Sequence, residues 1–258
     1  MTHRWHVAAL ALGMLALAGC AAQGQRDVLY QTSTINALLE GLYDGDTTLA
    51  ALATHGDFGI GTFDALDGEM VLVGGTVYQV RADGTVGRPG PEATTPFATV
   101  TFFDVDRTAD FDGAFDLADL TALIDQAAPG GNVPLAVRIT GTFKYVKTRS
   151  VPRQTKPYPR LAEVAKRQPT FEFRDAAGTI VGFRCPEYMK GLNVPGYHLH
   201  YLTADRSGGG HVLEIEMTAG RIEIDVTPAL HVALPTSRAF GEARLGEDRS
   251  AELQGVER

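Results

Sequence analysis

The chain has 258 residues, a formal net charge of −8 at pH 7 and 44% hydrophobic residues. This composition is typical of a folded globular protein, and the acidic balance, with no cluster of basic and aromatic residues, argues against nucleic acid as a partner. The length suffices for one large domain or two closely packed ones.

Residues 1–20 have the features of an export signal. An apolar run at residues 7–18 follows Arg4, and it is too short to cross a bilayer. The run closes with Leu-Ala-Gly-Cys, which is similar to the cleavage box of bacterial lipoproteins. We therefore expect Cys20 to be lipidated and to anchor the protein to the cell envelope, on its periplasmic or extracellular face. An ordinary secretory signal is the alternative. With Cys20 acylated, Cys185 has no partner, and no disulfide is predicted.

The first mature segment predicts short helices followed by strands. Thr34 can cap a helix over residues 35–42, where apolar positions recur at helical spacing, and a second short helix is expected over residues 48–53. Residues 63–80 predict a hairpin or meander with Asp67-Gly68 as its turn. Residues 81–96, rich in Gly and Pro, predict a loop, and a strand follows at residues 98–103.

The rest of the chain alternates strands and helices. Asp116 can cap a helix over residues 117–124, residues 135–149 alternate as a long strand, and residues 158–167 predict a helix. Short strands follow, with turns expected at residues 176–178 and 219–220. The fold class predicted is α+β, with mixed and antiparallel sheets in two closely packed β-rich halves, residues 21–150 and 151–258.

The long strand ends in two cations on its apolar side. Leu135, Val137 and Ile139 share a face that continues by parity to Lys147 and Arg149. For Lys147 we expect simple exit into solvent. Arg149 could instead stand at the mouth of a cleft, where a guanidinium can bind a carboxylate through two hydrogen bonds, although parity alone favours neither possibility.

Three histidines dominate the C-terminal half. His198 and His200 lie two apart in an alternating segment, so they project from the same face of a strand. A glycine-rich turn follows, and pairing of Thr203 near Gly208 would place His211 opposite His200 on that face. A lone strand histidine is usually an ordinary surface or core residue. Three on one face of a hairpin indicate a catalytic zinc site with an open coordination position.

Several segments together resemble the bacterial α-acetolactate decarboxylase family. They run in the same order and at similar spacing from about residue 29 to residue 235: LYQTST at 29–34, HGDFGIGTF at 55–63, LDGE at 66–69, GTF at 141–143, KTRS at 147–150 and PGYHLH at 195–200. The resemblance implies zinc on His198, His200 and His211. It also implies catalytic roles for Glu69, for Arg149 and, through a weaker Val-Glu match, for Glu257, and it places Thr62 near the metal in contact with substrate.

The activity that this resemblance implies is decarboxylation of α-acetolactate (2-hydroxy-2-methyl-3-oxobutanoate) to acetoin. Zinc would polarise the substrate ketone and stabilise the enediolate left when carbon dioxide departs. Arg149 would orient the substrate carboxylate or a neighbouring oxygen, and Glu69 or Glu257 would deliver a proton to one face of the enediolate. The family also implies a homodimer.

Two other functions stay open at this stage. A cupin-like metalloenzyme is one, because His-x-His on a strand also opens the cupin metal motif, although the Gly-rich continuation to His211 departs from it. A non-catalytic zinc-binding surface lipoprotein is the other, although the chain lacks the His/Asp-rich loops of such binders. A pocket that combines the histidines with glutamate and arginine would favour the decarboxylase.

Overall fold

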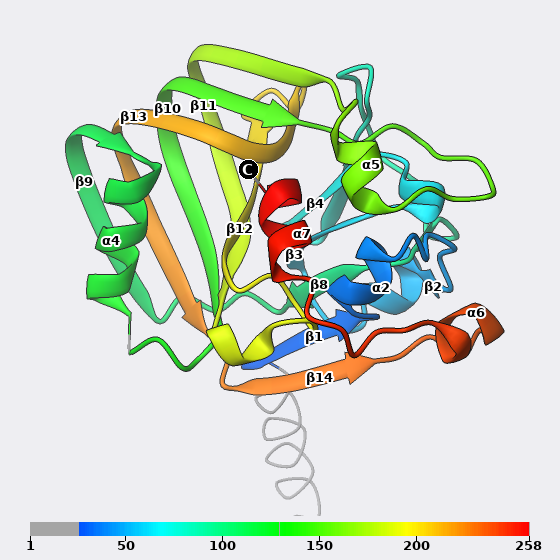
Figure 1. Ribbon diagram of the computed structural model, residues 1–258. Coiled ribbons are helices and arrows are strands. Elements are labelled where there is room, and N and C mark those ends of the chain that lie inside the picture. Colours follow the sequence, from blue (N-terminus) through cyan, green and yellow to red (C-terminus); the bar gives the residue numbers. More distant parts are fainter. Residues whose placement is uncertain (1–25, 129, 258) are drawn as a thin grey trace, which may run out of the picture.

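The computed structural model describes residues 26–128 and 130–257 (Figure 1). The export signal and Cys20 lie outside the described residues. The strands are β1 (Val28–Thr32), β2 (Thr47–Thr48), β3 (Phe58–Thr62), β4 (Glu69–Val73), β5 (Thr76–Val80), β6 (Val86–Gly87), β7 (Thr94–Thr95), β8 (Ala98–Thr101), β9 (Arg107–Asp116), β10 (Leu135–Arg149), β11 (Thr170–Cys185), β12 (Gly196–Thr203), β13 (Gly209–Val226) and β14 (Ala229–Ala233). The helices are α2 (Ile35–Leu39), α3 (Leu49–Leu52), α4 (Leu117–Ala127), α5 (Leu161–Ala165), α6 (Arg238–Glu242) and α7 (Ser250–Glu257), with 3-10 turns η1 (Asp64–Leu66) and η2 (Glu187–Met189).

Two main sheets carry the fold, and the α+β class predicted from sequence is confirmed in its coarse form. The seven-stranded sheet has the order β14-β1-β8-β3-β4-β5-β6, in which β14 runs parallel to β1 and the other pairs are antiparallel. The five-stranded sheet is antiparallel, with the order β10-β11-β12-β13-β9. Because β10 also pairs with β13, the strands β10 to β13 close into a ring.

Apolar side chains fill the space inside the five-stranded sheet and between the two sheets. Long strands such as β10 alternate, so their inward residues, including Val137 and Ile139, are fully buried under α4. A second core joins the sheets, with Phe58 and Val71 of one sheet packed against Val181 and Phe183 of the other. Figure 1 shows α4 beside β9 and β13, while α2, α5 and α7 gather on the opposite side of the molecule.

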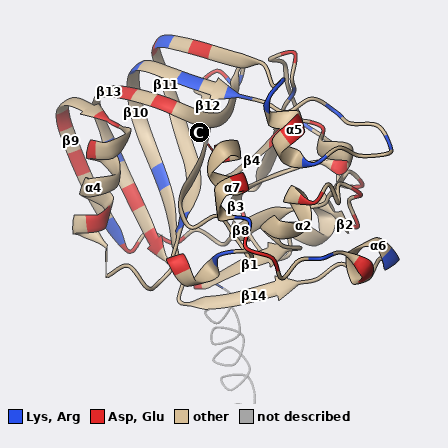
Figure 2. Cartoon of the chain, in the orientation of Figure 1, with Lys and Arg blue, Asp and Glu red and all other residues tan. Residues whose placement is uncertain are grey.

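Charged side chains pair across neighbouring strands on the outer faces. Figure 2 shows basic and acidic residues interspersed along the five-stranded sheet. Arg138 of β10 donates to Glu223 of β13 at 2.6 Å, and Lys147 pairs with Glu214 at 2.7 Å. Lys147 therefore leaves the strand toward solvent, as the sequence predicted.

The division of the chain between the sheets differs from the two halves expected on either side of residue 150. Strands β9 and β10 precede that residue and belong to the five-stranded sheet, whereas β14 follows it and joins the seven-stranded sheet. The sheet boundaries follow long-range strand pairing, which local sequence patterns do not encode. Within the described residues, no helix is long and apolar enough to span a membrane.

Three expected turns are wrong. The turn of the β4–β5 hairpin is Gly74-Gly75, and Asp67-Gly68 instead leads from η1 into β4. Both later glycine turns lie inside continuous strands, residues 176–178 in β11 and residues 219–220 in β13. At Gly178 a Cβ would lie 2.3 Å from the Tyr201 ring, so this glycine serves close packing rather than a change of direction.

The four helices predicted from the sequence are present as α2, α3, α4 and α5, although their ends differ from the predicted ones. Thr34 and Asp116 cap α2 and α4 through their side chains, and α4 extends to Ala127. The helix expected over residues 158–167 is only five residues long. The sequence patterns missed α6 and α7 near the C-terminus, and they missed the polar edge strand β9. Along β10, register shifts near Phe143 turn Tyr145 outward and Val146 into the core, so the expected parity fails there.

Candidate active site

The three histidines meet on the β12–β13 hairpin. His200 pairs directly with His211, and the amide of Thr203 donates to the Gly208 carbonyl at 3.0 Å, which is the register predicted from sequence. The two-residue period places His198 on the same face. One ring nitrogen from each of His198, His200 and His211 lies within 4.8 Å of the others, close enough for all three to hold a single metal ion.

These imidazoles are held neutral, which is the form that binds metals. Burial lowers the pKa of His198 to about 3, and it lowers the pKa of His200 and His211 well below the ordinary value, with the Arg149 charge adding to the effect. The His200 Nδ1 lies 2.8 Å from the Met70 carbonyl oxygen, so it carries the proton and donates it there. The buried Nε2 of His200 has no hydrogen-bond partner among the described residues, and its lone pair is free for a metal ion. The donor set therefore fits a divalent metal.

Arg149 ends β10 directly opposite His211. Its side chain is buried, with Nη1 donating to the Gln168 amide oxygen at 3.1 Å and Nη2 4.0 Å from Glu257 Oε1. Nε has no partner among the described residues. Sequence reasoning missed Gln168, because it precedes β11 in a short connection and carries no local signal. A buried guanidinium with a free donor can bind an anionic ligand.

Glu69 and Thr62 face each other across strands β4 and β3. Glu69 Oε2 lies 3.6 Å from His200 Nε2. Burial raises the pKa of Glu69 to about 7, although the Arg149 charge opposes this shift. The Thr62 hydroxyl donates to the Gly68 carbonyl at 2.7 Å, so its proton is already used and its oxygen can only accept.

Glu257 reaches the site from α7. Its Oε2 lies 3.7 Å from His211 Nε2, and burial raises its pKa to about 7 against the opposing charge of Arg149. The sequence offered only a short Val-Glu match for this residue, and its placement depends on a helix that sequence patterns missed. With Glu69, it gives the site two carboxyl groups that can hold or release a proton near neutral pH.

A small cavity of about 40 Å³ lies among these groups. Both polar and apolar side chains line it. Its lining includes Ile35, Leu38, Thr62, Leu66, Glu69, Phe97, Arg149, Val151, Leu161, His198, His211, Val256 and Glu257. The structure thus brings together the residues for which the sequence predicted catalytic, substrate-binding or metal-binding roles. The cavity therefore brings charged groups and apolar side chains together around one small space.

Comparisons with known proteins agree on one family. A family described as alpha-acetolactate decarboxylase matches residues 29–247. The chain is 50% identical over 232 residues to a protein of that name from Methanosarcina mazei, covering 90% of this chain and 81% of the relative. It is 45% identical to the one from Klebsiella aerogenes, covering 89% and 88%. The crystal structure of the Bacillus subtilis protein of that name superposes with a TM-score of 0.87 at 38% identity, covering 89% of this chain and 99% of that one.

Proposed function

The chain belongs to the α-acetolactate decarboxylase family, and we propose that it converts α-acetolactate to acetoin and carbon dioxide. The observation that carries the proposal is the convergence of unlike groups on one small cavity. The histidine cluster lies beside Arg149 and two buried glutamates, Glu69 and Glu257. A site for metal storage would need only the metal ligands, whereas these additional groups suit the handling of an anionic substrate and a proton.

We propose that His198, His200 and His211 hold zinc. Among the described residues, the group with metal-ligand spacing consists of three neutral imidazoles, which favours a catalytic rather than a structural zinc site. The same ligands accept other divalent ions, so the preference for zinc rests on imidazole chemistry and family membership. When bound, the metal would supply a Lewis acid toward the oxygens of the substrate.

The protein side chains have separate tasks in this proposal. Arg149 binds and orients the substrate carboxylate or a neighbouring oxygen through its guanidinium. Loss of carbon dioxide leaves the electron pair of the broken carbon–carbon bond in an enediolate, which becomes acetoin when its carbon accepts a proton. Glu69 or Glu257 supplies that proton, since burial raises the pKa of each carboxyl group to about 7. Delivery from one fixed position would give a single enantiomer.

The alternatives explain fewer features of the site. A cupin-like enzyme could use the same histidines, and strands β10 to β13 do close a ring, but it does not account for the glutamates and Arg149 around the cavity. A non-catalytic zinc lipoprotein would be expected to expose its ligands on open loops. Here His200 and His211 are buried.

One assay tests the proposed function. Protein lacking residues 1–20 is mixed with acetolactate, and acetoin and carbon dioxide are followed with and without a chelator. We expect equal amounts of both products, loss of turnover with the chelator and recovery on addition of zinc. Failure of the untreated protein to form acetoin would exclude the decarboxylase assignment.

Two further proposals concern the setting of the enzyme. We propose a homodimer, on the analogy of the family, and a lipid anchor at Cys20, on the cleavage-box sequence. Light scattering of the soluble form tests the first proposal, with a monomer as the contrary result.

A further inference from the structure

The C-terminal segment, residues 247–257, brings Glu257 to the site from a helix, whereas Glu69 begins strand β4. Its helix α7 spans eight residues, too few to be stable in isolation. Leu253 and Val256 are its two buried side chains, and they pack in a core shared with α2 and α5 (Figure 1). Burial of two apolar side chains stabilises the docked position of α7 only modestly. Other interactions must therefore fix the position of Glu257.

Arg249 lies directly before α7 and is nearly as buried as a core residue, with a side chain 4% exposed. Its guanidinium forms a close ion pair with Glu40, which follows α2, and its Nη1 lies 3.2 Å from Glu252 within α7. Nη2 also donates to the Arg244 carbonyl at 3.3 Å. One planar cation therefore ties the start of α7 to the end of α2 and to the approaching chain.

The same carboxylates also contact a third helix. Arg160, at the N-terminal end of α5, donates to Glu40 at 2.6 Å and lies 4.0 Å from Glu252. Glu40, Arg160, Arg249 and Glu252 thus form a closed network of two cations and two anions that links α2, α5 and α7. We call these four residues the tail clamp.

We propose that Arg249 is a positioning residue, which acts through the tail clamp to hold Glu257 at the histidines. This inference rests on the proposed function, because it assigns Glu257 a part in the reaction. Removing one partner of a buried ion pair leaves the other charge uncompensated, which is strongly unfavourable. Loss of Arg249 would leave only the half-exposed Arg160 to balance Glu40 and Glu252 where α2 meets α7, and α7 would lose its buried tie to α2. Glu257 would then leave its place beside Arg149 and His211.

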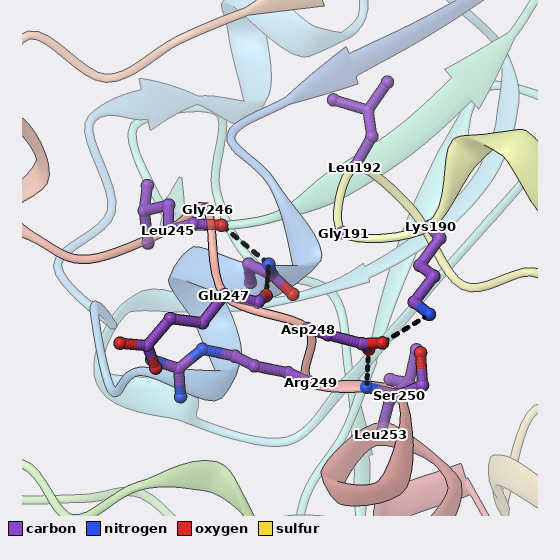
Figure 3. Close-up of a pocket in the computed structure, with 11 residues that line it drawn as sticks. Lys190, Gly191, Leu192, Leu245, Gly246, Glu247, Asp248, Arg249, Ser250 and Leu253 are labelled. Atoms are coloured by element: carbon purple, nitrogen blue, oxygen red, sulfur yellow. Dashed lines mark hydrogen bonds and ion pairs between the residues drawn. The ribbon is translucent and has the colours of Figure 1, made fainter.

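At the start of the segment, Arg249 is the buried charge, and the other contacts there are weaker. A cavity of about 450 Å³ lies between residues 190–192 and the stretch from Leu245 to Leu253, so the segment is loosely packed on that side (Figure 3). Across the cavity, Lys190 pairs with Asp248 at 2.8 Å, but both side chains are exposed. An exposed pair of this kind contributes little to stability. The Asn36 amide donates to the backbone at Leu245 and Glu247 and restrains the approach to α7 rather than α7 itself.

A double-mutant cycle tests whether Arg249 acts through Glu257. The variants are Arg249→Ala, Glu257→Gln and the two combined, measured in the zinc-loaded protein with acetolactate. Arg249→Ala should lower kcat at least tenfold with a smaller change in KM, and Arg249→Lys should restore part of the loss. In the Glu257→Gln background, Arg249→Ala should lower kcat less than twofold further. Independent, multiplicative losses would overturn the proposal.

Amide hydrogen exchange gives a readout that does not depend on turnover. In Arg249→Ala, amides of residues 250–257 should exchange at least tenfold faster, while those of β10 and β13 keep their rates. Unchanged exchange in α7 would also overturn the proposal. If the parent protein fails to decarboxylate acetolactate, the proposed function is wrong, and the exchange measurement still decides whether Arg249 clamps α7.

Two controls separate positioning from general loss of stability. Arg184 is equally buried, pairs with Asp125 at 2.8 Å and donates to the Gly130 carbonyl, but it holds α4 instead. Arg184→Ala should lower thermal stability without faster exchange in α7. Lys190→Ala, which removes the exposed pair on the C-terminal segment, should leave both exchange and kcat unchanged. Faster α7 exchange in Arg184→Ala, to the extent seen for Arg249→Ala, would mean a general loss of stability and would overturn the proposal.

Discussion

The side chain of Arg149 combines burial, charge and an unused donor. Its Nη1 is engaged by Gln168, and its Nε has no partner among the described residues. Lysine would keep the charge but offer a single point in place of a planar fork. We predict that Arg149→Lys keeps bound zinc and loses roughly a hundredfold in kcat/KM, the equivalent of a few kcal/mol from a charge-assisted contact. Metal analysis and steady-state kinetics on the same sample measure both.

Arg153 provides the matched control for this substitution. It lies four residues further on, is exposed and pairs with Asp64 and Asp67. Arg153→Lys should therefore retain parent activity. If Arg149→Lys also decarboxylated acetolactate at the parent rate, the arginine would be structural, and the substrate carboxylate would have to be bound elsewhere.

Glu69 tests the proton-transfer part of the proposal. Glu69→Gln keeps the size and hydrogen-bonding capacity of the side chain but cannot cycle a proton. We predict that this variant binds zinc normally, loses most of its turnover and, if Glu69 is the face-selective donor, forms acetoin of lower enantiomeric purity. Chiral chromatography of the product measures the last effect. If Glu69→Gln kept both the rate and the product chirality of the parent protein, the proton donor would be Glu257 instead.

Asp225 is a buried carboxyl group outside the active site, at the end of β13. Burial raises its pKa to about 7, and the neighbouring Asp106, Asp27 and Asp104 add to the shift. The folded protein thus keeps this proton up to about pH 7, whereas an unfolded aspartate releases it near pH 3.9. Its contribution to stability is fully present below that lower value and is lost as the pH rises through about 7.

We therefore predict that Asp225→Asn makes the protein less sensitive to alkaline pH. The amide keeps the neutral form, so the decrease in the free energy of unfolding between pH 5 and pH 8 should shrink by roughly 2 to 4 kcal/mol. Denaturant titrations at the two pH values measure the difference. The same substitution at the exposed Asp175 is the control, and an identical decrease in all three proteins would contradict the assignment.

At the scale of single residues, the sequence predicted the histidine cluster because strand parity and a short turn determine which side chains share a face. For Arg149, strand parity favoured neither a cleft nor solvent, and only the family resemblance placed it at the site. The register shifts in β10 break the expected alternation before this residue, which is nevertheless buried. Gln168 and Arg249 could not be found in this way. Each acts through a partner that is distant in sequence, and only the folded chain brings the two together.

Among the elements, strand β11 shows how a glycine can mislead a sequence-based prediction. Gly178 lies within the strand, where a Cβ would approach the Tyr201 ring to 2.3 Å. Tyr201 is fully buried and packs edge-on against Phe143, so it has no room to move. We predict that Gly178→Ala lowers the free energy of unfolding by about 1–3 kcal/mol through overpacking. Gly90→Ala, where the added Cβ meets open space, is the control in the same denaturation assay. Equal stability of both variants would contradict this packing role.

An element can be predicted from the sequence when its own residues carry a local signal, and it is missed when distant contacts stabilise it. Strand β10 alternates because one face packs in the core, and α4 begins at a side-chain cap, so both leave a local signal. Strand β9 is mostly exposed and polar and is held at the sheet edge by pairing with β13. Helix α7 likewise depends on tertiary contacts with α5, so its sequence carries little pattern of its own.

Over the whole molecule, pairing of distant segments determines the topology. Strand β14 crosses from the C-terminal region to run parallel to β1, and β10 pairs on both of its edges. Composition and local pattern predicted the α+β class but not these pairings, because sequence spacing does not specify which strands meet. The active site depends on the same arrangement, since Glu69 comes from one sheet, the histidines come from the other, and Glu257 comes from the C-terminal helix.

The lipid anchor is the prediction that concerns the whole molecule. Cys20 precedes Val28, the start of β1, by eight residues, so a fully extended linker would hold the domain within about 27 Å of the membrane surface. We predict that Cys20→Ser abolishes membrane association while the soluble domain keeps its activity. The control is Cys185→Ser, which changes a buried free cysteine and should leave the protein on the membrane. Fractionation and mass analysis of the mature N-terminus measure the outcome. Cleavage at another position with a free thiol at Cys20 would contradict the lipid anchor.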